Sequence, residues 1–239
     1  MILEGNVSVK AAVMGGKRKV NRIIADRTKH DKDTMWILHR AEEKGIEIIR
    51  ADREEIDQAA SGKTHGGLIA EAEGRMYQSS EDVLKKKKPF FAIVEGVEDP
   101  FNLGYVIRSL YASGCDGLFV DRRNWLNAEP VILKSSAGAF EYLDIVMSDD
   151  MSEEVRKMKK AGIRTLAAMR KDALVYTEAD LKRPLMIAVG GEMRGLSSSV
   201  LKEIESNIYI PYANDFRAAL NASAAVSVLS FEVMRQNGI

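Results

Sequence analysis

Hydrophobic and polar positions follow their most regular pattern after Pro89, where short apolar runs alternate with stretches of helical periodicity. Short buried strands separated by helices are typical of a mainly parallel sheet, so the pattern predicts an α/β fold. The predicted strands are 90–94, 118–120, 142–146, 164–168, 186–189 and 208–210. The predicted helices are 103–113, 128–134, 152–161, 197–205 and 222–236.

The residues before this region alternate between helical and strand patterns on a smaller scale. Asn6 and Asp33 are predicted helix N-caps, and Gly15 and Gly45 are predicted helix stops. Polar residues and four consecutive lysines, which are typical of a linker, then follow. We therefore expect a small α/β domain over 1–76, a linker over 77–88 and a second domain over 89–239. The predicted helices of the small domain are 7–14, 33–44 and 53–60, and its predicted strands are 19–25, 46–49 and 68–72.

Composition narrows the class of protein. Hydrophobic residues make up 46% of the chain and charged residues 29%, as in a globular protein with a packed core. No apolar run approaches ~20 residues and the first residues lack a basic segment before an apolar core, so neither a membrane span nor a secretory signal is expected. The single cysteine, Cys115, excludes an internal disulfide and a cysteine-clustered zinc site. We expect a cytoplasmic protein without a metal.

Charge is balanced overall but unevenly spread. Residues 1–88 hold 18 Lys and Arg against 15 Asp and Glu, and the remainder holds 17 against 20. Seven cations lie between Lys17 and Lys32, enough for several phosphate contacts if they share a face. A solvated basic face accounts for them equally well, so charge alone does not establish nucleic-acid binding.

Two loops near the C-terminus are the strongest candidates for a ligand site. The predicted strands 186–189 and 208–210 each run into a loop rich in Gly, Pro and Asn, and each loop ends at a helix. Because open α/β sheets bind ligands where strands end in such loops, we expect the two loops to form two walls of one pocket. Neither GxGxxG nor GxxxxGK[ST] occurs, which argues against a dinucleotide fold and a P-loop.

Three separated segments resemble, in order, the three motifs of the SpoU-type RNA 2′-O-methyltransferases of the SPOUT superfamily. They are NLGYVIR (102–108), GGEMRGL (190–196) and IPYANDFRAALNAS (210–223). SSAGAFEYLDI (135–145) is also similar to the segment between the first two motifs, so the resemblance covers nearly all of 89–239. The first domain resembles the ribosomal-protein-like substrate-binding domain that precedes the catalytic domain in many members, through HGGLIAEA (65–72) and its order of elements.

The resemblance implies a fold, a cofactor and a reaction. The C-terminal part is expected to form a trefoil knot, an exception to the rule against threaded chains. S-adenosylmethionine is the implied methyl donor, bound mostly by backbone groups. The implied acceptor is a ribose 2′-hydroxyl of structured RNA, with ribosomal RNA as the expected substrate. The family is typically a homodimer. The implied donor-binding residues are Gly190, Ile210 and Leu220 at the adenosine end, with Gly191 and Gly195 near it.

The resemblance also implies catalytic residues. Methyl transfer from a sulfonium needs no metal, but it needs a nucleophile held in line. Arg108 is the implied catalytic residue. Because an arginine side chain stays protonated up to about pH 12, we do not expect it to act as a base. We expect it to bind a phosphate and offset the developing alkoxide charge. Asn102, which is also a predicted helix cap, would orient Arg108 or the ribose, and Glu192 would bind Arg108 or backbone amides. Asn221 matches the asparagine of the third motif.

The third motif departs from the family pattern. Ala219 stands where the family usually has serine, and Asn214 or Asp215 where it has glycine. The lost hydroxyl is expected to cost ~1 kcal/mol of positioning. An alternative is therefore an RNA-binding or donor-binding relative with weak or no activity. Among other candidates, Cys115 is expected to be buried, while His65 and Trp125 are loop residues that RNA could contact.

Overall fold

The computed structural model describes residues 1–191, 193–215 and 217–238, and within it the chain forms two compact units. The first unit contains Met1–Met76 together with Asn124–Tyr142, and the second contains Tyr77–Arg123 and Leu143–Ile239. Each unit has its own sheet. None of the helices in the described part of the chain is long and apolar enough to cross a membrane.

The first unit is built on a four-stranded sheet in the order β1-β4-β2-β3. Strands β2 and β3 run parallel, whereas β4 is antiparallel to both β1 and β2. The predicted strands and helices are confirmed to within a few residues, and only the short strand β1 was not predicted. The elements are β1 (Ile2–Glu4), α1 (Gly5–Gly15), β2 (Val20–Asp26), α2 (Lys32–Glu43), β3 (Glu47–Ala51), α3 (Arg53–Ala59) and β4 (Leu68–Ala72).

The two N-caps predicted for this unit are wrong. Helix α2 is capped by Asp31, whose carboxylate accepts the N–H of Thr34 at 3.0 Å. Asp33 lies inside the helix, and so does Asn6 in α1, where its amide donates to the Asp33 carboxylate at 3.0 Å. A capping side chain must reach an N–H two or three residues onward, and Asp31 and Asp33 satisfy this pattern equally in the sequence. The structure separates them, because Asp31 accepts the N–H of Thr34, whereas Asp33 lies within the helix.

Residues 124–142, which follow the first strands of the second unit in the chain, pack with the first unit. They contain α6 (Glu129–Ser135) and a short 3₁₀ helix, η1 (Ala139–Glu141). The buried guanidinium of Arg18 lies 2.9 Å from the Glu129 carboxylate and 2.6 Å from that of Glu141. Arg18, one of the seven cations considered for RNA contacts, is therefore part of the interior of this unit.

The second unit confirms the predicted mainly parallel sheet. Its described strands run in the order β7-β6-β5-β10-β8-β11-β9, and all of their pairings are parallel. The sequence missed the short α4 and β9. The elements are α4 (Ser80–Val83), β5 (Phe90–Glu95), α5 (Pro100–Ala112), β6 (Gly117–Asp121), β7 (Ile145–Ser148), α7 (Met151–Lys160), β8 (Arg164–Ala168), β9 (Ala173–Val175), β10 (Leu185–Gly190), α8 (Ser198–Glu203), β11 (Ser206–Tyr209) and α9 (Ala222–Gln236).

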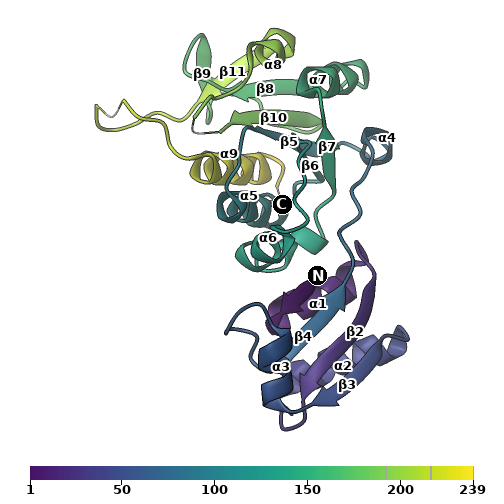
Figure 1. The fold of residues 1–239 in the computed structure, drawn as a ribbon. Coiled ribbons are helices and arrows are strands. Elements are labelled where there is room, and N and C mark those ends of the chain that lie inside the picture. The colour runs from purple at the N-terminus through teal and green to yellow at the C-terminus, as the bar shows by residue number, and fades with distance from the viewer. Residues whose placement is uncertain (192, 216, 239) are drawn as a thin grey trace. The chain divides into compact units, whose positions relative to one another are not determined.

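Helices cover both faces of this sheet, with α5 and α9 on one side and α7 and α8 on the other (Figure 1). Alternate residues of a strand point to opposite faces, and β5 shows this directly. Phe91 and Ile93 join the cluster that contains Val155 and Met158 of α7. Phe90 and Ala92 face the side of α5 and α9. Burial on both faces explains why β5 reads as a continuous apolar run.

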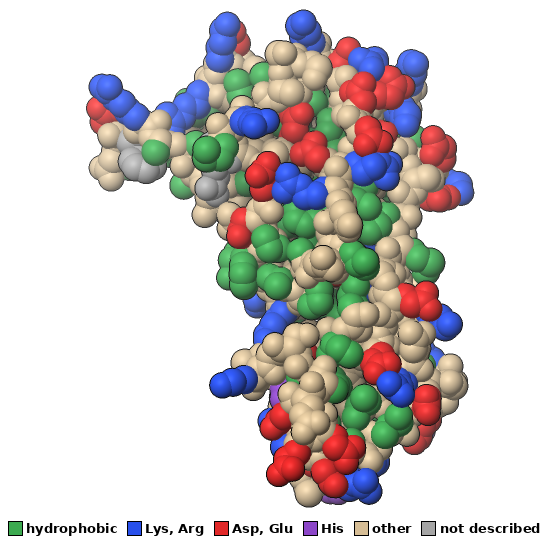
Figure 2. All heavy atoms as spheres, viewed as in Figure 1, with side chains coloured by type: hydrophobic (Ala, Val, Ile, Leu, Met, Phe, Trp, Pro, Cys, Tyr) green, Lys and Arg blue, Asp and Glu red, His purple; other side chains and the backbone are tan. Residues whose placement is uncertain are grey.

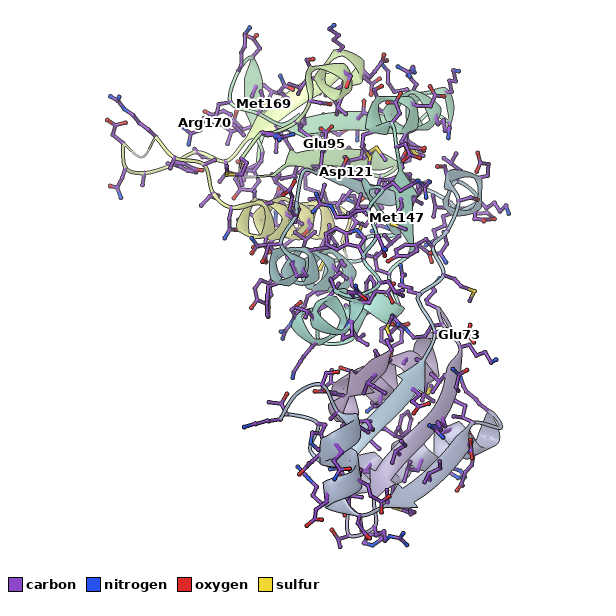
Figure 3. All side chains as sticks on the ribbon, viewed as in Figure 1. Glu73, Glu95, Asp121, Met147, Met169 and Arg170 are labelled. Atoms are coloured by element: carbon purple, nitrogen blue, oxygen red, sulfur yellow. The ribbon has the colours of Figure 1, made fainter. Side chains whose placement is uncertain are left out.

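The strand order brings distant segments together at one edge of the sheet. Strand β10 lies between β5 and β8, and its last residue, Gly190, pairs with Glu95 at the end of β5. Strand β8 also pairs with β11. Because all these strands are parallel, the loops that follow β5, β8, β10 and β11 leave from the same edge. Figure 3 shows Glu95 and Asp121 near the ends of neighbouring strands, with Met169 and Arg170 just beyond β8.

Candidate functional site

A cavity of about 350 Å³ lies at this edge, beyond the ends of β8, β10 and β11. Both C-terminal loops contribute to it, which confirms that they form two walls of one pocket. A third wall comes from the residues after β8, which the sequence analysis did not include. The described lining residues are Ala168, Met169, Arg170, Val189, Gly190, Gly191, Gly195, Leu196, Ile208, Tyr209, Ile210, Tyr212, Arg217, Ala219, Leu220, Ala225 and Leu229.

The wall after β10 can be made only with glycine. A Cβ added to Gly190 would lie 2.3 Å from the carbonyl carbon of Gly195, and one added to Gly191 would lie 2.3 Å from the carbonyl oxygen of Gly96. Both distances are far below any real contact of a Cβ atom. The loop also turns back on itself, since the N–H of Gly195 donates to the Gly191 carbonyl at 2.9 Å. The glycines therefore let backbone, rather than side chains, face the cavity.

Glu95 fastens this loop to the end of β5. Its backbone carbonyl accepts the N–H of Gly191 at 2.6 Å, and its carboxylate accepts the N–H of Ser197 at 2.7 Å. Ser197 in turn caps α8, where its hydroxyl accepts the N–H of Val200. The loop is thus held at both ends by one residue of the neighbouring strand, which gives the cavity a fixed wall.

The opposite wall is the loop between β11 and α9. Asn221 caps α9, because its side-chain oxygen accepts the N–H of Ala224 at 2.8 Å. The hydroxyl of Tyr212 accepts the N–H of Leu220 at 2.9 Å, and the guanidinium of Arg170 lies 4.4 Å from the centre of the Tyr212 ring. Arg170 and Arg217 are the charged residues among the described lining, which is otherwise apolar or glycine.

This lining fits the methyl donor implied by the sequence. S-adenosylmethionine combines an adenosine and an aliphatic chain with a carboxylate, and ligand pockets of this kind are mostly apolar with a few polar groups. The glycine backbone at Gly190 and Gly191 leaves room for close approach, and Arg170 and Arg217 provide positive charge for a carboxylate. All five residues expected to bind the donor line the cavity.

The expected catalytic residues are placed differently. Arg108 and Asn102 lie on α5 and are not among the cavity lining, and Glu192 lies outside the described residues. The prediction that Asn102 caps α5 is wrong, because the cap is Asp99, whose carboxylate accepts the Asn102 N–H at 2.8 Å. Asn221 is next to the lining residue Leu220. The fold therefore brings the donor-binding candidates together at the cavity, whereas Arg108 and Asn102 are not among its described lining residues.

Arg108 is exposed and makes no hydrogen bond or ion pair with the described residues. Its neighbour Ser109 contacts Ser227 of α9 through their hydroxyl oxygens, 2.7 Å apart. The helix that carries Arg108 is thus joined to the helix that follows the third motif. An exposed arginine without a carboxylate partner is suited to bind an incoming phosphate.

The remaining candidate residues from the sequence, Trp125, His65 and Cys115, are buried in the structure. Trp125 and His65 are both buried, and the His65 ring lies 2.9 Å from the Asp57 carboxylate, so neither is placed for base stacking. Cys115 is buried as predicted, and its burial raises the pKa of its thiol to about 12. The lining residues that the sequence analysis missed most clearly are Arg170 and Tyr212. Arg170 follows a predicted parallel strand, so its place at the ligand edge was a usable signal.

Comparisons with known proteins identify the family of both parts of the chain. Residues 89–231 match the SpoU rRNA methylase family, and residues 2–78 match the domain described as RNA 2′-O ribose methyltransferase substrate binding. The chain is 26% identical over 239 residues to the 23S rRNA (guanosine-2′-O-)-methyltransferase RlmB of Shewanella oneidensis, covering 98% of this chain and 97% of that protein. It is 28% identical over 243 residues to an uncharacterized tRNA/rRNA methyltransferase of Synechocystis, covering 99% of this chain but only 63% of that relative.

Solved structures share the fold. The SpoU methyltransferase AviRb of Streptomyces viridochromogenes, in complex with AdoMet, matches with a TM-score of 0.81 at 21% identity, covering 99% of this chain and 90% of that one. An AdoMet-bound rRNA methyltransferase of Sinorhizobium meliloti matches with a TM-score of 0.80 at 20% identity, covering 98% and 86%. The first family match alone spans more than half of the chain and includes all three motif segments. The chain therefore belongs to the SpoU rRNA methylase family, with that family's substrate-binding domain ahead of the methylase region.

Proposed function

We propose that this protein transfers a methyl group from S-adenosylmethionine to a ribose 2′-hydroxyl of structured RNA, with ribosomal RNA as the substrate. The observation that supports this most is the cavity at the ends of β8, β10 and β11, which gathers all five donor-binding candidates. Relatives named as rRNA methyltransferases and AdoMet-bound structures of the same fold support the same reaction.

Backbone groups of the two C-terminal loops hold the donor in this proposal. Gly190, Ile210 and Leu220 contact its adenosine end, and Gly191 and Gly195 shape the wall beside it. The donor supplies a methyl group on a sulfonium, which is already activated for transfer. The chain must then exclude water and hold the acceptor oxygen in line with that methyl group, because positioning accounts for much of such a reaction's barrier.

Arg108 acts on the acceptor side. We assign it to a phosphate of the RNA and to the negative charge that develops on the 2′-oxygen, since its guanidinium is exposed and forms no ion pair with the described residues. Asn102, on the same helix, orients Arg108 or the ribose. Asn221 uses its side-chain oxygen to cap α9, which leaves its amide group for the substrate. Glu192 completes the proposed set as a partner of Arg108 or of backbone amides.

The first unit binds RNA in this proposal, in keeping with its match to a substrate-binding domain.

We also propose a homodimer. Figure 2 shows hydrophobic side chains gathered over the face that carries α5 and α9, and large exposed side chains there are Phe101, Tyr105, Tyr111 and Phe231. Exposed apolar area of this kind favours association with a second copy. A knotted C-terminal region and a cytoplasmic location complete the proposal, as the family implies.

The decisive experiment measures transfer of tritium from labelled S-adenosylmethionine to ribosomal RNA. The RNA comes from cells that lack the gene, so that its target site is unmodified, and RNA from wild-type cells is the control. We expect incorporation into the first RNA only, and ribose mapping then identifies the nucleotide. Tight RNA or donor binding without incorporation would instead support the alternative, a relative with weak or no activity. The reason to test this alternative is Ala219, which stands where the third motif usually has serine.

A further inference from the structure

Three segments meet at one wall of the donor cavity. Arg170 follows β8, Tyr212 lies in the loop after β11, and Leu220 lies just before α9. All three line the same cavity. Nothing in the motif pattern assigns a role to Arg170 or Tyr212.

Tyr212 connects the other two residues. Its hydroxyl accepts the N–H of Leu220 at 2.9 Å, a contact across eight residues of the same loop. The face of its ring lies 4.4 Å from the guanidinium of Arg170, within the range of a cation–π contact. Tyr212 is half-buried, whereas Arg170 is exposed. One side chain therefore bridges the loop after β8 and both ends of the loop after β11.

The loop has few other attachments. Residues 213–215 and 217–219 make no hydrogen bond with the rest of the described chain, and all of them are exposed. Leu220 precedes the helix cap Asn221, so its N–H has no partner inside the helix. The hydroxyl of Tyr212 supplies that partner, in a loop where Ala219 has no hydroxyl of its own.

We propose that Tyr212 is a positioning residue of the donor cavity. Its hydroxyl accepts the Leu220 N–H and so joins the two ends of the loop between β11 and α9. Its ring contacts Arg170 and holds it at the cavity wall. Closing the loop in the free protein lowers the entropy that donor binding would otherwise have to remove. This role concerns the binding of S-adenosylmethionine and so rests on the function proposed above.

Tyr212→Phe tests the hydroxyl alone, because it keeps the ring that faces Arg170. One neutral hydrogen bond is worth about 1 kcal/mol, which corresponds to about fivefold in a dissociation constant. We expect calorimetric titration to show about fivefold weaker binding of S-adenosylmethionine. The KM for the donor should rise by a similar factor, while kcat at saturating donor and the KM for RNA stay unchanged. Tyr176→Phe, which removes a hydroxyl outside the cavity lining, is the matched control and should change neither constant.

A second measurement needs no ligand. Hydrogen exchange of peptides that contain the Leu220 amide should be faster in Tyr212→Phe than in the wild type, with the same melting temperature. If the wild type does not bind S-adenosylmethionine, the proposed function fails while this measurement still decides whether Tyr212 closes the loop. Unchanged exchange at Leu220 would overturn the proposal. Tighter donor binding by Tyr212→Phe would also overturn it, since the hydroxyl would then compete with the donor for the Leu220 N–H.

Discussion

The hydroxyl oxygens of Ser109 and Ser227 lie 2.7 Å apart and join α5 to α9. Ser109 follows Arg108, and α9 begins at Ala222, within the third motif. The hydrogen bond therefore couples the helix that carries the proposed RNA-binding arginine to the helix that ends the donor cavity. The two helices cover the same face of the sheet (Figure 1), so the proposed acceptor side and the proposed donor side pack on one face.

Replacing Arg108 should separate these two sides. Because Arg108 is exposed and does not line the cavity, Arg108→Ala should leave donor affinity unchanged. Methyl transfer should fall by about 10²–10³-fold, the range for loss of one group that stabilises developing charge. Single-turnover transfer and calorimetry measure the two quantities. Arg108→Lys, which keeps the charge without the forked geometry, should retain part of the activity. Loss of donor binding in Arg108→Ala would show that the residue belongs to the donor side.

Two glycines of the same loop should respond differently to alanine. In Gly191→Ala the new Cβ would overlap the Gly96 carbonyl, so the loop or the end of β5 must move. We expect donor affinity to fall at least tenfold, because a loss of only about 1.4 kcal/mol of binding free energy raises a dissociation constant tenfold. Gly195 has a positive φ of 64° but open space around it, so Gly195→Ala should lower the free energy of unfolding by about 1–2 kcal/mol through backbone strain and change donor affinity less than Gly191→Ala. Equal effects on donor affinity would contradict the close-packing argument.

Asn221 should show a stability effect that is separable from catalysis. Asn221→Ala removes the cap of α9 and should lower the free energy of unfolding by about 1 kcal/mol, whereas Asn221→Ser keeps a capping oxygen and most of that stability. Chemical denaturation measures both. If the amide group also serves the substrate, Asn221→Ser should be stable but slow. Full activity of this variant would leave Asn221 as a helix cap only.

The buried Arg18 should be essential to the first unit. Arg18→Met removes the guanidinium that pairs with the buried carboxylates of Glu129 and Glu141, and removing one partner of a buried ion pair typically costs about 3–5 kcal/mol. Urea unfolding should show this loss, and adding Glu129→Gln and Glu141→Gln to the variant should recover much of it. Lys19→Met is the neighbouring control, because its ion pair with Glu73 is exposed and should be worth little. Equal stabilities of the two single variants would contradict the role of the buried cluster.

Cys115 should make the fold sensitive to alkali. Burial raises the pKa of its thiol from 9.0 to about 12, so the folded state favours the neutral thiol. The resulting stability is present below about pH 9 and is lost as the pH rises towards 12, because only the unfolded chain then releases the proton. Melting temperatures should fall less between pH 9 and 11 in Cys115→Ala than in the wild type. A thiol reagent at pH 8 should label Cys115 only in denaturant, and rapid labelling of the native protein would contradict its burial.

Much of the second unit could be predicted from the pattern of apolar residues. Strand β8 and helix α9 have the predicted bounds, because a strand buried on both faces leaves a short apolar run and a long helix with one apolar side leaves a helical period. The short strands β1 and β9 were missed, since three residues are too few to establish a period. The caps were harder still, because neighbouring polar residues such as Asp31 and Asp33 compete for one role.

The sequence by itself determined the family, the order of the elements and the residues of the two C-terminal loops that line the cavity. Only the tertiary structure showed that Arg170 and Tyr212 complete the cavity, that Arg18 is buried and that residues 124–142 pack with the first unit. The reason is physical. Motifs and periods record what neighbouring residues need locally, whereas these contacts join segments as far apart as Arg18 and Glu141, and they form only when the strand order brings the segments together.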